Sequence, residues 1–347
     1  MKEQHMFAGV NSPKGFYSCF EHIMPDYPGK RKIYIKGGPG MGKSSIMKKI
    51  AKKAREESLD CELFHCSSDP VSLDGVHIPA LDLAVLDATA PHNCDPVFTG
   101  FGGEIFDVSH FLQKEKLIAD ADVILETVNR KKQAFSTGYQ YLNAALPLIR
   151  LTENLYFTHL DVPAISRLAE SLCERVMGKG EYTGGTQRKL FLSAIGPEGF
   201  VNFCDTVLRD TYTVAVKGKC GTALFMRRFA EIARLRGFSP VTFYCPMRPD
   251  EKIEHVYIPS LRFALTTYDF YTRAKAAEII DTDEYISPMP EDNGEAHGYA
   301  SRLMQCAMDA FFEAKAAHAA LEKIYVPAMD FAALEEKTAI LLQSIFK

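Results

Sequence analysis

The feature that most constrains the fold is a repeat. FAGVNSPKGF, from Phe7 to Phe16, matches FLSAIGPEGF, from Phe191 to Phe200, in its outer Phe residues, its Pro and its second Gly. Four further pairs of segments follow in the same order: KIYIKGGPGMGKSS with TVAVKGKCGTA, LFHCSSDP with TFYCPMRP, HIPALDLAVLD with YIPSLRFALTT, and DVPAISRLAESL with YVPAMDFAALEE. Chance similarity would not preserve the order of so many segments. The chain is therefore a tandem duplication.

The duplication predicts the domain organisation. A chain of 347 residues is long enough for two domains, each with its own apolar core. The Gly-rich, polar stretch from Gly178 to Lys189 has the composition of a linker between them. We predict one domain over residues 1–180 and a second over residues 189–347. Because their blocks match, we also expect the halves to pack through equivalent surfaces, with pseudo-twofold symmetry.

Within each half, short apolar runs alternate with helical patterns. In the first half the pattern predicts three strands and one helix, at Ile33–Ile35, Cys61–Cys66, Leu81–Leu86 and Ser44–Glu57 respectively. From about Ile105 to Val176 the pattern is helical, with breaks expected near Pro147 and Pro163. This alternation predicts an α/β fold in each half, a mostly parallel sheet flanked by helices.

Composition excludes several classes of protein. The sequence contains no run of about 18 apolar residues that could span a bilayer. The first residues, MKEQHMFAGV, do not resemble a secretory signal, which favours a cytoplasmic location. Nine cysteines without a Cys-x-x-Cys pair argue against a disulfide framework and against a common structural zinc site. A net charge of −4 gives no clear nucleic-acid signature.

The first half contains a phosphate-binding motif. GGPGMGKS, from Gly37 to Ser44, fits G-x-x-x-x-G-K-[ST] between a predicted strand and a predicted helix. Lys43 is expected to reach the β and γ phosphates of ATP, and the Ser44 hydroxyl is expected to bind Mg²⁺. The residues predicted to contact the nucleotide are Gly37, Gly38, Pro39, Gly40, Met41, Gly42, Lys43, Ser44 and Ser45.

Acidic and imidazole side chains follow two other predicted strands. Asp87 ends the apolar run LDLAVLD and is the expected second metal-binding residue. Asp69 in CSSDP and His92 in DATAPHNCDP are candidates for a catalytic base. An equally good interpretation is that Asp69 and His92 stabilise loops beside prolines.

The second half lacks these groups. Its loop is two residues shorter, and Thr222 and Ala223 stand where the first half has Lys43 and Ser44. Thr267 aligns with Asp87, so the acidic residue is missing as well. We therefore predict a degenerate nucleotide site in this half. The alternative is an unusual anion site built on Lys219, because a Gly-Lys turn before a helix can still bind an anion.

With these motifs the chain resembles the P-loop NTPase superfamily, and more closely a bacterial family of tandemly duplicated P-loop ATPase-like proteins. The resemblance rests on GGPGMGKSS, HCSSDPVSLDGVHIP, LDATAPHNCDP and LFLSAIGPEGF and extends over essentially the whole chain. It implies two tandem P-loop NTPase-like domains. It also implies an ATP-binding protein or a nucleotide kinase.

These observations predict a cytoplasmic, Mg²⁺-dependent ATPase with one active site in the first half and a regulatory or structural second half. One alternative is a kinase that transfers the γ-phosphoryl group to a small molecule or nucleotide. Another is a nucleotide-sensing module with negligible turnover. Arg188, Lys189 and Arg248 are candidates to supply positive charge to the site from across the interface.

Overall fold

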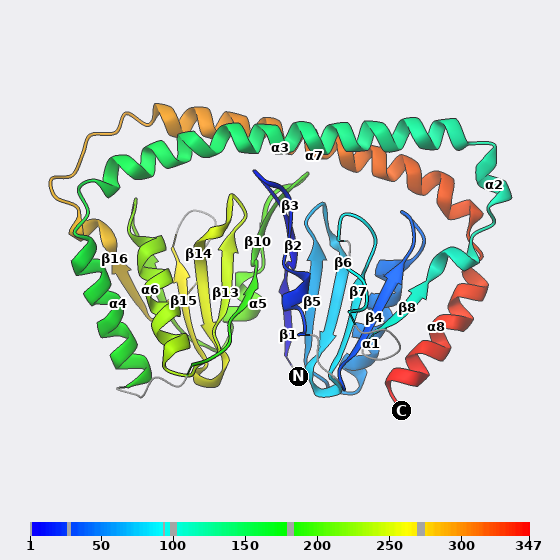
Figure 1. The fold of residues 1–347 in the computed structure, drawn as a ribbon, viewed down its shortest axis with the longest axis horizontal. Coiled ribbons are helices and arrows are strands. Elements are labelled where there is room, and N and C mark those ends of the chain that lie inside the picture. Colours follow the sequence, from blue (N-terminus) through cyan, green and yellow to red (C-terminus); the bar gives the residue numbers. More distant parts are fainter. Residues whose placement is uncertain (1, 26–28, 93, 98–102, 179–183, 269–274) are drawn as a thin grey trace.

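The computed structural model describes residues 2–25, 29–92, 94–97, 103–178, 184–268 and 275–347. Figure 1 shows two sheets standing next to each other beneath two long helices. Part of the predicted linker, residues 179–183, lies outside the described residues. In the described part of the chain, no helix combines the length and the apolar character needed to cross a membrane.

Each half forms a six-stranded sheet. The strand order in the first half is β1 (Glu3–Met6), β5 (Cys61–Cys66), β6 (Asp69–Ile78), β7 (Leu83–Asp87), β4 (Arg31–Lys36) and β8 (Glu104–Asp107). The second half has the corresponding order β9 (Arg188–Leu190), β13 (Val241–Cys245), β14 (Arg248–Ile258), β15 (Phe263–Thr267), β12 (Tyr212–Lys217) and β16 (Glu278–Asp281). This shared order confirms the α/β fold and the repeated halves.

The sheets are mixed, whereas the sequence predicted mostly parallel ones. Strand β6 runs antiparallel to both β5 and β7, and β14 does the same in the second half. The other neighbouring pairs are parallel. Strand β6 was missed because its sequence, DPVSLDGVHI, lacks the apolar run that marks its neighbours. A short hairpin replaces the helical crossover that a parallel pair would need.

Smaller elements complete each half. Two-stranded hairpins are formed by β2 (Gly9–Ser12) with β3 (Gly15–Ser18) and by β10 (Ser193–Gly196) with β11 (Gly199–Asn202). The short helices are α2 (Glu115–Ile118) and α5 (Cys204–Leu208). The 3-10 turns are η1 (Phe20–His22), η2 (Pro79–Leu81), η3 (Val108–Phe111), η4 (Pro259–Leu261), η5 (Thr282–Tyr285) and η6 (Val326–Ala328).

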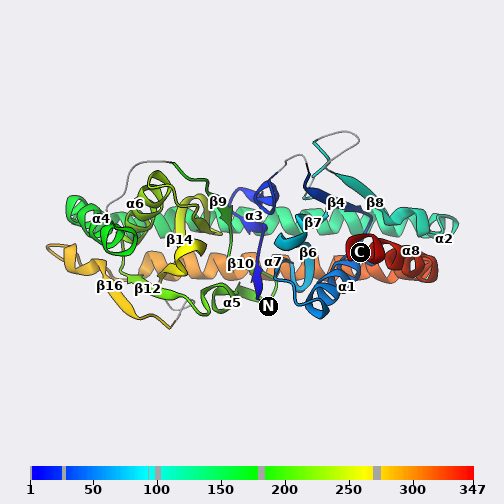
Figure 2. The same cartoon turned by 90° about the horizontal axis from the view of Figure 1, so that it is seen from below.

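Two long helices, α3 (Ala121–Phe157) and α7 (Glu295–Tyr325), lie side by side and extend over both sheets (Figure 2). They pack closely, since a Cβ at Gly138 would lie only 2.4 Å from the Phe311 ring. The predicted break at Pro147 is wrong, because α3 continues through it. Proline removes one helical hydrogen bond, and its neighbours Leu146 and Leu148 pack in the α3–α7 interface, which offsets that loss.

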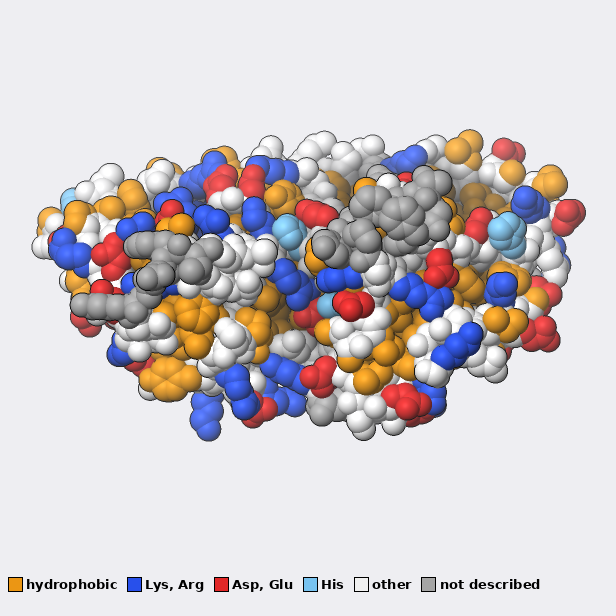
Figure 3. Space-filling model, turned by 60° about the horizontal axis from the view of Figure 1, so that its bottom comes forward, with side chains coloured by type: hydrophobic (Ala, Val, Ile, Leu, Met, Phe, Trp, Pro, Cys, Tyr) orange, Lys and Arg blue, Asp and Glu red, His pale blue; other side chains and the backbone are white. Residues whose placement is uncertain are grey.

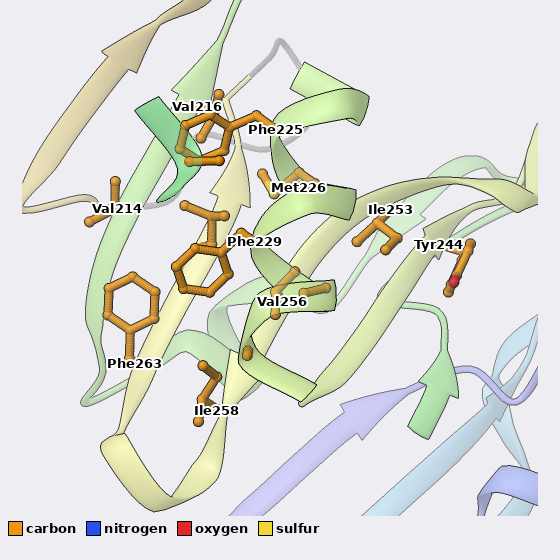
Figure 4. Close-up of a cluster of buried hydrophobic side chains, with 14 of the residues drawn as sticks. Val214, Val216, Phe225, Met226, Phe229, Tyr244, Ile253, Val256, Ile258 and Phe263 are labelled. Atoms are coloured by element: carbon orange, nitrogen blue, oxygen red, sulfur yellow. The ribbon is translucent and has the colours of Figure 1, made fainter. Parts of the chain in front are cut away.

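The two halves exchange their last helices. Helix α4 (Val162–Met177) packs on α6 (Thr222–Leu235) of the second half, and α8 (Phe331–Ile345) packs on α1 (Lys43–Glu56) of the first half (Figure 1). In Figure 4, side chains of α6 lie against β12 in the core that α4 completes. Each half of the sequence, divided at residues 180–189, therefore contributes its last helix to the core of the other half.

Reciprocal hydrogen bonds fix this exchange. The Asp161 N–H donates to the Tyr285 carbonyl at 2.9 Å, and the Asp330 N–H donates to the Phe111 carbonyl at 2.8 Å. Asp161 and Asp330 cap α4 and α8 in the same way. Asp161 and Asp330 are therefore the equivalent residues. The sequence alignment of DVPAISRLAESL with YVPAMDFAALEE is wrong, because it matches Val162 of α4 with Val326, which lies in turn η6 before α8.

The halves also meet at a self-matching contact. The N–H of Phe7 donates to the carbonyl of Phe191 at 2.8 Å, and the N–H of Phe191 donates to the carbonyl of Phe7 at 3.0 Å. Around this contact, residues of both sheets share one apolar cluster. Because equivalent residues contact each other, the halves are related by a pseudo-twofold axis, as the repeat predicted.

Candidate nucleotide site

The predicted phosphate-binding loop, residues Gly37–Ser44 and called the P-loop below, runs from the end of β4 into the start of α1. Gly40 and Gly42 have φ values of +68° and +89°, which favour glycine over residues with side chains. Within the loop the Gly38 N–H donates to the Met41 sulfur at 2.8 Å. Met41 is buried, Pro39 is half-buried, and Ser45 is exposed on α1. Most of the predicted loop residues are therefore placed around one turn at a helix N-terminus.

Lys43 folds back over the P-loop. Its ammonium donates to the carbonyls of Gly37 at 2.7 Å and Gly38 at 2.8 Å. The same ammonium lies 3.6 Å from Asp87 Oδ2, and 12% of the Lys43 side chain is exposed. Phosphate oxygens could take the place of these two carbonyls as acceptors for the lysine.

Asp87 lies beside the P-loop because its strand pairs with β4. Parallel pairing sets Asp87 opposite Ile35, two residues before the loop begins. Thr89 ties the two segments together, since its hydroxyl donates to the Gly37 carbonyl at 2.9 Å and its N–H donates to Asp87 at 2.9 Å. The structure therefore brings the two strongest sequence candidates, Lys43 and Asp87, into one site.

Ser44 points toward β6. Its hydroxyl oxygen accepts a hydrogen bond from the Leu73 N–H at 3.0 Å. The next residue on that strand is Asp74, which the sequence analysis did not select. Antiparallel pairing of Gly75 with Leu86 places Asp74 opposite Asp87.

Asp74, Asp87 and His92 form a compact cluster. Ligand atoms of the three side chains all lie within 4.8 Å of one another, and His92 Nε2 is 3.6 Å from Asp74 Oδ2. Burial raises the pKa of Asp74 to about 6, with His92 opposing the shift and Asp87 adding to it. Among the residues that the structure describes, Asp74 Oδ2 and His92 Nδ1 are buried and have no hydrogen-bond partner.

The donor set of this cluster fits a divalent cation. Two carboxylates converge there, and the Ser44 hydroxyl lies beside the same strand. One carboxylate oxygen, Asp74 Oδ2, is buried and accepts no hydrogen bond from the described residues. Mg²⁺ is bound by oxygen atoms in proteins. The predicted metal-binding residues Ser44 and Asp87 are thus joined by Asp74.

Asp69 lies outside this cluster. Its carboxylate accepts from the Ser72 hydroxyl at 2.6 Å and forms an ion pair with Lys315 of α7 at 3.3 Å. In the second half, Arg248 of β14 forms an ion pair with Glu153 of α3 at 2.6 Å. Asp69 and Arg248 each attach the sheet of their own half to the long helix of the other half. The sheet residue is acidic in the first half and basic in the second.

The second half covers the P-loop. A Cβ at Gly40 would lie 2.9 Å from Val326 Cγ2 and 3.3 Å from Glu322 Cα, at the end of α7. A Cβ at Gly42 would lie 3.1 Å from Leu334 of α8. The candidate site is therefore built from both repeats, even though its motif lies in one.

The equivalent loop of the second half has its own internal contacts. The Lys219 N–H donates to Asp283 at 2.7 Å, so a carboxylate of the protein already occupies this donor. The Lys219 ammonium donates to the Tyr156 hydroxyl at 3.0 Å and lies 4.5 Å from the centre of that ring. These contacts disfavour an anion site built on Lys219.

The cations proposed to reach the site from across the interface lie elsewhere. Arg188 donates to Glu62 at 2.8 and 2.9 Å, and Arg248 is paired with Glu153. The Lys189 ammonium lies 5.8 Å from the centre of the Tyr244 ring. On the face shown in Figure 3, the described basic and acidic side chains are interspersed.

Comparisons of the chain with models of protein families, with curated proteins and with solved structures gave no match.

Sequence reasoning missed Asp74 and Thr89. Asp74 precedes Gly75, which pairs with Leu86 on the strand that ends at Asp87. This position identifies Asp74 only once β6 is known to run antiparallel to β7. Thr89 follows Asp87 by two residues, the spacing at which its N–H can bond the Asp87 carboxylate.

Proposed function

We propose that this protein is a P-loop NTPase that binds Mg-ATP at a single site in its first half. One observation carries the proposal. Lys43 of the P-loop lies 3.6 Å from Asp87 at the end of the adjacent parallel strand, within a loop at a helix N-terminus. This arrangement offers backbone N–H groups and an ammonium to phosphate, and carboxylates to a metal ion.

In this proposal each residue has a defined role. Lys43 exchanges its two carbonyl acceptors for phosphate oxygens, and Ser44 and Asp87 hold Mg²⁺, with Asp74 beside them. Bound Mg²⁺ would neutralise charge on the β and γ phosphates. Tyr325, Val326 and Leu334 pack on the loop glycines and would shield the bound phosphates from water. Catalysis then consists of ATP hydrolysis in the first half, with the second half as the structural and regulatory partner.

A second candidate function is phosphoryl transfer to a small molecule or nucleotide. Within the described residues, Asp74 Oδ2 and His92 Nδ1 have no hydrogen-bond partner, which favours this function. Buried groups with unused hydrogen-bonding capacity can orient or deprotonate an acceptor hydroxyl. ADP formation that depends on an added acceptor would identify a kinase. Tight binding with negligible ADP formation would identify a nucleotide sensor.

Calorimetry with Mg-ATP tests the proposal. Lys43→Ala should weaken ATP binding by about 10- to 100-fold, the effect of losing hydrogen bonds from a charged donor. The matched control is Lys219→Ala in the degenerate loop, which should leave binding unchanged. Two equivalent ATP sites, or unchanged affinity in the Lys43 variant, would contradict the one-site proposal.

A further inference from the structure

Helices α3 and α7 bring two further nitrogen-bearing side chains toward the P-loop. The close contact between Gly138 and Phe311 fixes the register of the two antiparallel helices. Lys131 lies seven residues before Gly138, and His318 lies seven residues after Phe311. Seven residues are about two helical turns, so both side chains stay on the contacting faces and come to the same level.

That level is directly above the candidate site. Lys315, one turn before His318 on α7, forms an ion pair with Asp69 at the β5–β6 turn. Glu322, one turn after His318, packs on Gly40 of the P-loop. The segment of α7 that carries His318 is therefore fixed to the β5–β6 turn at one end and to the P-loop at the other, with Lys131 of α3 beside it.

Lys131 has no counter-ion in the described part of the chain, where it forms neither an ion pair nor a hydrogen bond. It is half-buried. Burial lowers its pKa, and the positive charge of Lys43 lowers it further. Burial and the charges of Lys131 and Lys43 also lower the pKa of His318 to about 4. The register of α3 and α7 and the packing of Glu322 on Gly40 place Lys131 on the side of the P-loop that carries Lys43. An anion between the two ammonium groups would relieve the repulsion of their charges.

We propose that Lys131 binds the terminal phosphate of the nucleotide held by the P-loop. This inference rests on the proposed function and extends it, since it makes α3 the element that distinguishes a triphosphate from a diphosphate. Lys43 reaches the phosphates from below, at the start of α1. Lys131 reaches them from the opposite side, on a helix that also spans the second half.

The test compares two adjacent lysines in the full chain. Lys131→Met removes the charge but keeps the apolar part of the side chain, and Lys132→Met is the matched control at an exposed neighbour. Binding of Mg-ATP and Mg-ADP is measured by calorimetry. We expect Lys131→Met to weaken ATP binding by about 10- to 100-fold and ADP binding by less than about threefold. Lys132→Met should change neither.

Thermal unfolding without nucleotide provides a second readout. A half-buried, unpaired cation beside Lys43 costs stability, so the melting temperature of Lys131→Met should equal or exceed that of the wild type. An unchanged ratio of ATP to ADP affinity, or equal loss of both with a lower melting temperature, would overturn the proposal for Lys131. Failure of the proposed function is a separate result, seen as no ATP binding by the wild type or as undiminished binding by Lys43→Ala.

Discussion

Replacing Glu62 with glutamine tests the ion pair that joins the first sheet to the second half. Glu62 of β5 accepts hydrogen bonds from Arg188 of β9 at 2.8 and 2.9 Å, and it lies 2.7 Å from His77 Nδ1. Arg188 also donates to the carbonyls of His22 and Ile23. Only 13% of the Glu62 side chain is exposed. Loss of the Glu62 carboxylate would leave the Arg188 guanidinium partly buried without its counter-ion.

The magnitude follows from the pKa of Glu62. Burial alone would raise this pKa, but the hydrogen bonds from His77 and Arg188 lower it from 4.5 to about 2. A lowering of this size corresponds to about 3 kcal/mol of folding free energy. Because the folded-state pKa is the lower one, this stability is fully present above a pH of about 4.5. It is lost as the pH falls toward about 2.

Urea unfolding followed by circular dichroism measures the effect. We expect Glu62→Gln to lower the free energy of unfolding by about 3 kcal/mol at neutral pH, and by less than half as much near pH 3. The control is Glu251→Gln. Glu251 pairs with Arg150 at 2.6 Å in an exposed position, so this variant should lose less than about 1 kcal/mol of unfolding free energy. If the two variants cost the same, or if the Glu62 effect does not shrink in acid, the reasoning is wrong.

Two further predictions concern the P-loop and the exchanged helices. Gly40→Ala should cost about 2 kcal/mol of unfolding free energy and weaken ATP binding, because its φ is +68° and the new Cβ would press on Val326. The control is Gly15→Ala, at φ +95° with no atom of the described residues within 4 Å of the new Cβ, so only the backbone conformation destabilises it. Equal losses of stability and ATP affinity in the two variants would refute the steric argument. Ile165→Ala in α4 should cost about 2–5 kcal/mol in denaturant unfolding, because Ile165 is buried in the core of the second half. The exposed control Ile340→Ala should cost under about 1 kcal/mol, and a similarly small cost for Ile165 would contradict the exchange.

The sequence predicted the repeated fold well and the helix exchange not at all. Matching blocks carry matching strands, so the shared strand order follows from the duplication. Helices α4 and α8 descend from one ancestral helix and begin with the same cap, at Asp161 and Asp330, so either could pack on either core. The choice is made by α3, whose 37 residues span about 55 Å and carry the chain to the other half.

Some residues of the candidate site could also be predicted from the sequence, and others could not. The P-loop and Asp87 were found because each is a local pattern at the end of an apolar strand. Asp74 reaches the site through antiparallel pairing, and Lys131 reaches it through the register of two long helices. Such positions depend on tertiary packing, which a single sequence does not display.

The reciprocal contact between Phe7 and Phe191 has an evolutionary consequence. A protein equal to one half could form a symmetric homodimer through this contact, with each subunit lending its last helix to the other. Because one gene encodes both subunits of such a dimer, a mutation in the loop would change both copies of the loop. Fusion into a single gene fixes the stoichiometry at one to one and separates the two copies. Under the proposed one-site function, the second loop could change to a sequence such as GKCGTA, while the helices of its half stay under selection because they pack on the first loop.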